Sequence, residues 1–215
     1  MSRREELAEK LGHVQAKISR SDVTLIVVTK TYPVSDVQIL HDLGVRNFGE
    51  NRSEEGAEKS AIVGATWHFQ GGIQSRKLRD IALWADVVHS LDNSGHISKL
   101  ESATQKSMDV FLQLSLDGDP SRGGVIESEL AVLADQVLAT ANLKLLGLMC
   151  VPPVDADPRK AFTEISQIHR RFISRYSGAS SLSAGMSGDY EIAMDCGATH
   201  IRVGSSILGS RAPHE

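Results

Sequence analysis

The sequence predicts a single closed α/β barrel of eight parallel strands, each followed by a helix, with one further helix at the N-terminus. Segments typical of strands and of helices alternate along the whole chain. The first strand segment, residues 24–30, is apolar on both alternating faces, as expected of a parallel strand covered by helices. The length of 215 residues lies at the short end of the range for such barrels.

The first half of the chain begins with a helix predicted over residues 3–20, where apolar residues repeat at helical spacing: Leu7, Leu11, Val14 and Ile18. After the strand at 24–30, a helical pattern over 34–44 ends at Gly44, a residue that commonly stops helices. Further strands are expected at 45–48, 66–69 and 86–89. The helices between them are expected at 52–63, from 75 onward and at 96–106.

The second half continues the alternation. Strands are expected at 110–116, 144–149, 181–183 and 200–203. Helices are expected at 127–140, at 158–176 with His169 on its outer side, and in short segments opening near 185–189 and at 204–209. No linker or low-complexity segment divides residues 1–215, so one domain is expected. An open doubly wound sheet is the alternative, although the first strand lacks the Gly-x-Gly-x-x-Gly turn of dinucleotide-binding folds.

Composition narrows the class of function. The net charge is −4 and basic residues are scattered among acidic ones, which disfavours nucleic acid as a partner and favours a small molecule. The two cysteines, Cys150 and Cys196, lack zinc or disulfide spacing, so no metal is expected and both thiols are predicted to be reduced. No apolar run resembles a signal or a membrane span, which predicts a cytoplasmic protein with no membrane partner.

Lys30 is the first candidate functional residue. It closes the first strand, and Ile26 and Val28 share its alternating face, so it is expected to reach the barrel mouth from inside. Partial burial lowers the pKa of a lysine and favours the neutral amine that attacks aldehydes. A strand-end lysine that simply leaves the core for water is the alternative.

Two loops rich in glycine and serine follow the seventh and eighth strands. The first runs over 185–189 and the second over 204–209, and each precedes a helical segment. Such loops direct backbone N–H groups toward an anion, and barrel enzymes often bind phosphate after these two strands. The eighth strand of a closed barrel neighbours the first, so the sequence predicts a phosphate site close to Lys30. Helix capping by the same residues is the alternative.

Several ordered motifs resemble one known family. They are Thr29-Lys30, Phe48-Gly49-Glu50-Asn51, Trp67-His68-Phe69-Gln70-Gly71-Gly72-Ile73-Gln74-Ser75, Leu146-Gly147-Leu148-Met149, Leu182-Ser183-Ala184-Gly185-Met186-Ser187 and Ile201-Arg202-Val203-Gly204-Ser205-Ser206-Ile207-Leu208-Gly209. Together, over about residues 24–211, they resemble the pyridoxal phosphate homeostasis proteins of the YggS/PROSC type. The resemblance implies a fold similar to the N-terminal barrel of alanine racemase, known as fold type III of pyridoxal phosphate proteins.

The same resemblance implies a set of cofactor-binding residues. Lys30 would bind pyridoxal 5′-phosphate (PLP) covalently as a Schiff base, and the phosphate would be held by Met186, Ser187, Gly204 and Ser205. Asn51 would lie near the cofactor, although a residue in this setting is by default a helix N-cap. Gly72 and Arg76 depart from the residues usual in the family and receive no site role. His68 is expected to be a hydrogen-bonded core histidine.

Arg202 has two possible roles under this resemblance. It could serve the phosphate, or it could face the pyridine nitrogen and keep that nitrogen unprotonated, which weakens the ring as an electron sink. With Glu215 as the last residue, the second domain of the racemases is not expected, and none of Tyr32, Tyr176 and Tyr190 is expected to supply the missing base.

The expected function is therefore homeostasis of vitamin B6, by a monomeric carrier or buffer of PLP with little or no turnover. Its other partners would be amino acids and the PLP-dependent enzymes that accept the cofactor. A PLP-dependent amino-acid racemase and a Schiff-base aldolase acting on a sugar phosphate are the alternatives.

Overall fold

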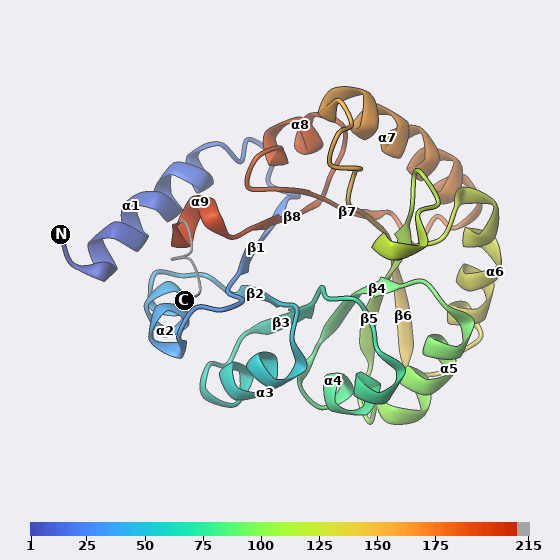
Figure 1. The fold of residues 1–215 in the computed structure, drawn as a ribbon, viewed down its shortest axis with the longest axis horizontal. Coiled ribbons are helices and arrows are strands. Elements are labelled where there is room, and N and C mark those ends of the chain that lie inside the picture. Colours follow the sequence, from blue (N-terminus) through green and yellow to red (C-terminus); the bar gives the residue numbers. More distant parts are fainter. Residues whose placement is uncertain (210–215) are drawn as a thin grey trace.

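The computed structural model describes residues 1–209, and these form a closed barrel of eight parallel strands in chain order (Figure 1). The strands are β1 (Thr24–Val28), β2 (Asn47–Glu50), β3 (Thr66–Phe69), β4 (Val87–Leu91), β5 (Met108–Leu114), β6 (Leu143–Cys150), β7 (Ser181–Met186) and β8 (His200–Val203). The ring closes where β1 pairs with β8, with Ile26 opposite Arg202. The predicted barrel is thereby confirmed, and the open doubly wound sheet is wrong.

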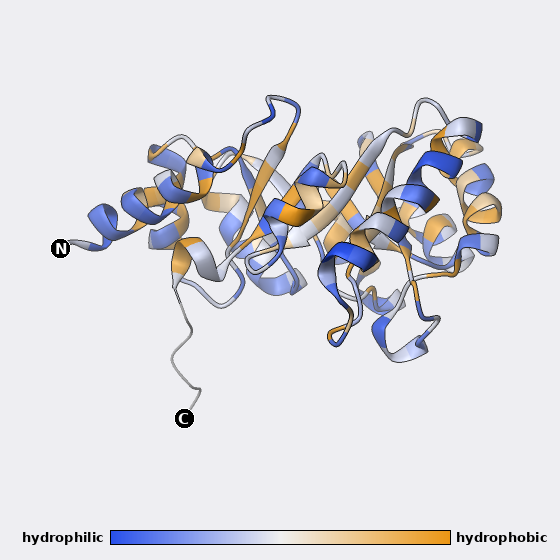
Figure 2. Cartoon of the chain, turned by 90° about the horizontal axis from the view of Figure 1, so that it is seen from above, coloured by the Kyte–Doolittle hydropathy of each residue, from blue (hydrophilic) through white to orange (hydrophobic). Residues whose placement is uncertain are grey.

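Helices surround the strands. They are α1 (Arg3–Ala16), α2 (Val34–Asp42), α3 (Ser53–Ile62), α4 (Leu78–Trp84), α5 (Ser94–Ala103), α6 (Glu127–Leu138), α7 (Pro158–Arg175), α8 (Tyr190–Asp195) and α9 (Ser205–Leu208). Two short 3₁₀ helices, η1 (Ser75–Lys77) and η2 (Pro120–Arg122), lie in loops. In Figure 2 the helices show hydrophilic and hydrophobic residues side by side, because each helix turns one stripe toward the strands.

The N-terminal helix is shorter than predicted. It begins with a capping box between Ser2 and Glu5 and ends at Ala16, not at residue 20. Ile18 still packs against the core beyond the helix end, which is why the apolar spacing continued past the last helical turn. The Arg3 guanidinium donates to Asp36 of α2 at 2.6 Å and to the Leu208 carbonyl of α9 at 3.0 Å, and so joins both ends of the described chain.

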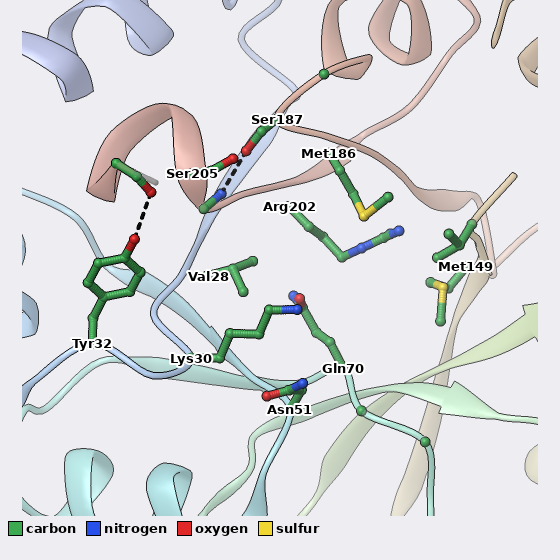
Figure 3. Close-up of a pocket in the computed structure, with 16 residues that line it drawn as sticks. Val28, Lys30, Tyr32, Asn51, Gln70, Met149, Met186, Ser187, Arg202 and Ser205 are labelled. Atoms are coloured by element: carbon green, nitrogen blue, oxygen red, sulfur yellow. Dashed lines mark hydrogen bonds between the residues drawn. The ribbon is translucent and has the colours of Figure 1, made fainter. Parts of the chain in front are cut away.

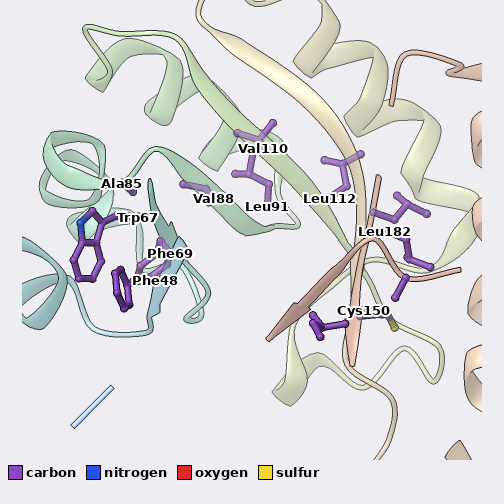
Figure 4. Packing of buried hydrophobic residues seen from close by; sticks show 14 of the residues in the cluster. Phe48, Trp67, Phe69, Ala85, Val88, Leu91, Val110, Leu112, Cys150 and Leu182 are labelled. Carbon is purple, nitrogen blue, oxygen red and sulfur yellow. The ribbon is translucent and has the colours of Figure 1, made fainter. Parts of the chain in front are cut away.

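The main hydrophobic core lies between the strands and the helices (Figure 4). Phe48 of β2 stacks on Trp67 of β3, and Trp67 meets Trp84 of α4 edge to face. A separate small cluster of Val87, Phe111 and Met149 also forms from strand residues. His169 of α7 is buried, so its predicted place on the outer side of that helix is wrong.

Residues 210–215, which the predicted domain includes, lie outside the described residues. A one-domain organisation over residues 1–215 therefore stays a prediction. No helix of the described residues is both long enough and apolar enough to cross a membrane. Within the same residues, no group of three or more histidine, cysteine or acidic side chains is placed to hold a metal ion.

Candidate functional site

A cavity of about 560 Å³ opens at the carboxyl ends of the strands, a size typical of small-molecule sites (Figure 3). It is lined by all of the site residues that the sequence singled out: Lys30, Asn51, Met186, Ser187, Arg202, Gly204 and Ser205. These residues follow, end or lie within β1, β2, β7 and β8, which the closed barrel brings together because β7 pairs with β8, β8 with β1 and β1 with β2.

Lys30 lies in the turn after β1 rather than in the strand itself. The strand ends at Val28, although the Thr29 N–H still donates to the Gly49 carbonyl at 3.0 Å. The next residue, Thr31, has a φ of +69°, a left-handed conformation that is unfavourable for a β-branched residue. In Figure 3 the half-buried Lys30 side chain extends along the pocket toward Gln70.

Arg202 lies deep in the barrel, 5% exposed. Its guanidinium donates to Ser183 Oγ at 2.7 Å and to the Cys150 carbonyl at 3.1 Å. Burial lowers the pKa of Arg202 to about 10, which leaves it charged at neutral pH. Figure 3 shows its side chain running away from Ser187 and Ser205 toward Met149. The charge is therefore directed at the middle of the cavity rather than at the two serines.

A buried hydrogen-bond chain continues from Arg202 through the barrel interior. Ser183 Oγ lies 2.9 Å from His89 Nδ1, and His89 Nε2 lies 2.9 Å from His68 Nδ1. His68 Nε2 lies 3.1 Å from Asn47 Oδ1, an acceptor, so each imidazole donates through Nε2 and accepts at Nδ1. The Ser183 hydroxyl then donates to His89 and its oxygen accepts from Arg202. His68 is thus a hydrogen-bonded core histidine, as predicted.

The two histidines of this chain are neutral. Burial lowers the pKa of His68 to about 3, and it lowers the pKa of His89 well below its usual 6.5, with the charge of Arg202 acting in the same direction. The Arg202 charge is thus held by dipoles and not by a carboxylate. Cys150, whose carbonyl accepts from Arg202, has a thiol pKa that burial raises to about 12, so this cysteine is a packed thiol.

Backbone N–H groups at the start of α9 converge on the Ser187 hydroxyl. Ser187 Oγ accepts from the Gly204 N–H at 3.1 Å and from the Ser206 N–H at 3.3 Å. The Ser206 hydroxyl donates back to the Ser187 carbonyl at 3.2 Å. Two N–H groups that meet at one oxygen are the arrangement that also binds a phosphate oxygen. We refer to Ser187, Gly204, Ser205 and Ser206 as the cradle.

Some details of the loops differ from the prediction. Met186 ends β7 rather than lying in the following loop, and its N–H donates to Asp189 Oδ1 at 2.6 Å. Asn51 is not the N-cap of α3, because that position belongs to Arg52. The default interpretation of Asn51 as a helix cap is therefore wrong, and its place in the cavity wall is what distinguishes it.

Several wall residues were not singled out from the sequence. Gln70, Gly71 and Gly72, in the turn after β3, and Met149, at the end of β6, line the cavity. A Cβ on Gly71 would lie 2.2 Å from the Asn51 carbonyl oxygen, so only glycine fits beside that backbone. The signal was the Gln-Gly-Gly run directly after a strand, which indicates close backbone approach. Arg76 does not line this cavity.

Comparisons with known proteins agree with this geometry. Residues 3–212 match the model of the alanine racemase N-terminal domain family. The pyridoxal phosphate homeostasis protein of Corynebacterium glutamicum is 40% identical over 200 residues, covering 88% of this chain and 90% of that protein. This chain belongs to the pyridoxal phosphate homeostasis protein family. Its resemblance to the pyridoxal phosphate homeostasis proteins, which the ordered motifs indicated, is thereby confirmed.

Solved structures extend the likeness to the fold. The chain is similar to PipY of Synechococcus elongatus PCC7942 in a structure with PLP bound, with a TM-score of 0.86, 28% identity, and coverage of 94% of this chain and all of that one. Alanine racemase of Clostridium difficile 630 shares the fold at a TM-score of 0.77 and 14% identity. This chain covers 61% of that racemase chain.

Proposed function

We propose that this protein binds pyridoxal 5′-phosphate in the barrel-mouth cavity, attaches it covalently through Lys30, and acts in homeostasis of the cofactor inside the cell. The observation that carries the proposal is the amine and the cradle in the walls of one cavity, on the adjoining strands β1 and β8. The names of the relatives and the PLP-bound PipY structure support the same ligand. When bound, the cofactor supplies an aldehyde that amines attack reversibly.

The wall residues suit the parts of this ligand. Gly204, Ser205 and Ser187 would hold the phosphate through N–H and hydroxyl donors, with Met186 beside them. For the phosphate to meet the Gly204 N–H, the Ser187 hydroxyl has to turn aside and donate instead of accepting. Asn51 lies on the Lys30 side of the cavity and would contact the ring.

Arg202 is assigned to the pyridine side of the cofactor rather than to the phosphate. Its guanidinium points away from the cradle and is anchored on Ser183 and Cys150. A fixed positive charge there would hold the ring nitrogen of bound cofactor unprotonated and would make the ring a poor acceptor of electrons from a bound amino acid. This charge favours storage over chemistry.

The charge of Arg202 is one reason to propose little or no turnover, and the acid–base groups of the cavity wall are the second. Racemisation requires positioned acid–base groups on both faces of a substrate carbon. Among the described residues that line the cavity, Tyr32 is the one phenol, and its hydroxyl already donates to the Gly209 carbonyl at 2.7 Å. The Corynebacterium glutamicum relative is named a homeostasis protein, which favours neither the racemase nor the aldolase alternative.

The decisive experiment is spectroscopic. The purified protein mixed with PLP should show a yellow absorbance that borohydride bleaches, and peptide mapping should then find the pyridoxyl group on Lys30. Lys30→Ala should stay colourless, while Lys106→Ala, an exposed lysine paired with Asp86, should behave as the unmodified chain does. Attachment to another lysine, or full colour in Lys30→Ala, would refute the assignment.

A second experiment addresses turnover and partners. Chiral chromatography after long incubation with L-alanine or L-serine should detect no inversion, and steady inversion that disappears in Lys30→Ala would establish a racemase. We also propose a cytoplasmic monomer that passes PLP to cofactor-requiring enzymes, with amino acids as further ligands. Light scattering tests whether the protein is a monomer. The transfer is tested by mixing the PLP-loaded protein with an apoenzyme. Direct transfer predicts that the apoenzyme regains activity faster than the loaded protein releases free PLP.

A further inference from the structure

The turn that carries Lys30 is held in an unfavourable backbone conformation. Thr31 is the one non-glycine residue with a positive φ, +69°, among the described residues. A β-branched side chain in this region is strained, and such strain persists only where the surroundings enforce it. The contacts on either side of Lys30 identify the groups that enforce the positive φ of Thr31.

Three charged side chains from β2 and α3 supply those contacts. Glu55 Oε2 accepts from the Thr31 N–H at 2.6 Å. Lys59 Nζ donates to the Thr29 carbonyl at 2.8 Å, and Glu50 Oε1 accepts from the Thr29 hydroxyl at 2.6 Å. The residue before Lys30 and the residue after it are thus both fixed. We refer to Glu50, Glu55 and Lys59 as the turn clamp.

The clamp is itself an ionic network, in which Lys59 and Glu50 are removed from water and Glu55 is half-buried. Lys59 Nζ lies 2.6 Å from Glu50 Oε1 and 3.3 Å from Glu55 Oε2, and Lys59 and Glu50 are 3% and 0% exposed. A buried ion pair is usually no more stabilising than a packed apolar pair. Glu50 Oε2 is also buried without a hydrogen-bond partner. Stability alone is therefore a poor explanation for these charges.

The protonation of the clamp agrees with its contacts. Burial alone would raise the pKa of Glu55, but the hydrogen bond from the Thr31 N–H and the charge of Lys59 outweigh it and lower that pKa. Glu55 is therefore a carboxylate at neutral pH and a strong acceptor for the Thr31 N–H. The hydrogen bond from the Thr31 N–H to Glu55 joins the strained residue directly to the clamp.

We propose that Glu50, Glu55 and Lys59 are positioning residues, which hold the left-handed turn at Thr31 and so place the Lys30 amine for reversible attachment of PLP. This inference rests on the proposed function. While the phosphate stays in the cradle, attachment requires the amine to meet the aldehyde carbon. A turn that relaxes to negative φ shifts the backbone of Lys30 and lowers the effective concentration of the amine there.

The test combines loss of the clamp with relief of the strain. Glu55→Ala should lower the equilibrium constant for yellow-adduct formation about tenfold, because the Thr31 N–H loses its acceptor. Thr31→Gly alone should bind like the unmodified chain, since glycine adopts positive φ without strain. The double variant Glu55→Ala/Thr31→Gly should recover to within about threefold of the unmodified chain, because the turn no longer needs to be forced.

Controls separate the outcomes. Glu54→Ala changes the neighbouring residue of α3, whose exposed carboxylate pairs with Lys77, and should leave adduct formation unchanged. Glu55→Gln keeps an acceptor and should lie between the unmodified chain and Glu55→Ala. Equal binding by Glu55→Ala, or a loss that Thr31→Gly does not restore, would overturn the inference. Absence of the yellow adduct in the unmodified chain would instead overturn the proposed function.

Discussion

The two walls of the cavity are built from different kinds of interaction. On the β1–β2 side, the Lys30 turn is fixed from behind by buried charges that do not face a ligand. On the β7–β8 side, the cradle presents backbone N–H groups whose partner is a single serine hydroxyl. One wall is therefore held by the protein's own ion pairs, and the other by a contact that a ligand oxygen can replace.

The difference shows how one cavity combines a fixed reactive group with an exchangeable anion site. An amine that must meet a carbon atom requires a defined position. Buried charges hold that position because leaving one of them without its partner is costly. A phosphate requires donors that exchange one oxygen for another, and a small hydroxyl does so at little cost. Substitutions should therefore have larger effects behind Lys30 than in the cradle.

The largest effect is expected from removing the buried cation of the clamp. Lys59→Met should lower the free energy of unfolding by about 3–5 kcal/mol, because Glu50 is left as an uncompensated buried carboxylate. Lys17→Met, which removes an exposed lysine paired with Glu191, should have no measurable effect. Urea unfolding of both variants measures the contrast. Similar midpoints for the two would show that the β1–β2 side does not depend on its buried charges.

A backbone contact on the same side offers the next largest effect. Gly71→Ala should lower the free energy of unfolding by about 1–3 kcal/mol and weaken PLP binding, because its Cβ would meet the Asn51 carbonyl at 2.2 Å. Gly64→Ala is the matched control, since Gly64 does not line the cavity and a Cβ there meets nothing within 4 Å. Urea unfolding and PLP titration compare the two. An unchanged Gly71→Ala variant would mean that this turn adapts freely.

Much of this arrangement could be predicted from the sequence, because strand order in a closed barrel determines which loops meet. The continuous apolar strand at β1 and the glycine–serine loops after β7 and β8 indicated that Lys30 and the cradle share a cavity. Apolar periodicity predicted these elements to within a few residues, because it indicates which face of each helix or strand is buried.

The turn clamp could not be predicted in the same way. Glu50, Glu55 and Lys59 look like ordinary charged residues before and within a helix, and nothing in their spacing indicates burial. Their role depends on how α3 packs against the end of β1, which is a tertiary contact. The direction of Arg202 was likewise undecided, because its partner Ser183 on β7 and the carbonyl of Cys150 on β6 are distant in sequence.

A pH dependence tests the buried chain that joins the two walls. Burial lowers the pKa of His89 well below 6.5, so the folded protein keeps it neutral while the unfolded chain takes up a proton below that pH. Its contribution is present above pH 6.5 and is lost as the pH falls, as it also is for His68 and His200. Glu50, whose pKa burial raises, opposes this slope.

The measurement is the free energy of unfolding between pH 7 and about pH 5. His89→Gln should remove one titrating group and flatten the loss of stability on acidification by about 1 kcal/mol per pH unit. His13→Gln removes a histidine of α1 that lies on the exposed surface, and its profile should parallel that of the unmodified chain. Parallel profiles for both variants would show that His89 takes up its proton in the folded protein as it does in the unfolded chain.

The smallest effect is expected in the cradle itself. Ser187→Ala removes one hydroxyl donor but also frees the Gly204 and Ser206 N–H groups, so the two changes partly offset each other. PLP binding should weaken by no more than about tenfold, equivalent to about 1.4 kcal/mol, and urea unfolding should change little. Pyridoxal, which lacks the phosphate, is the matched ligand and should bind both proteins equally. An equal loss for both ligands would place Ser187 at the ring, and the β7–β8 wall would then lose its role as an anion site.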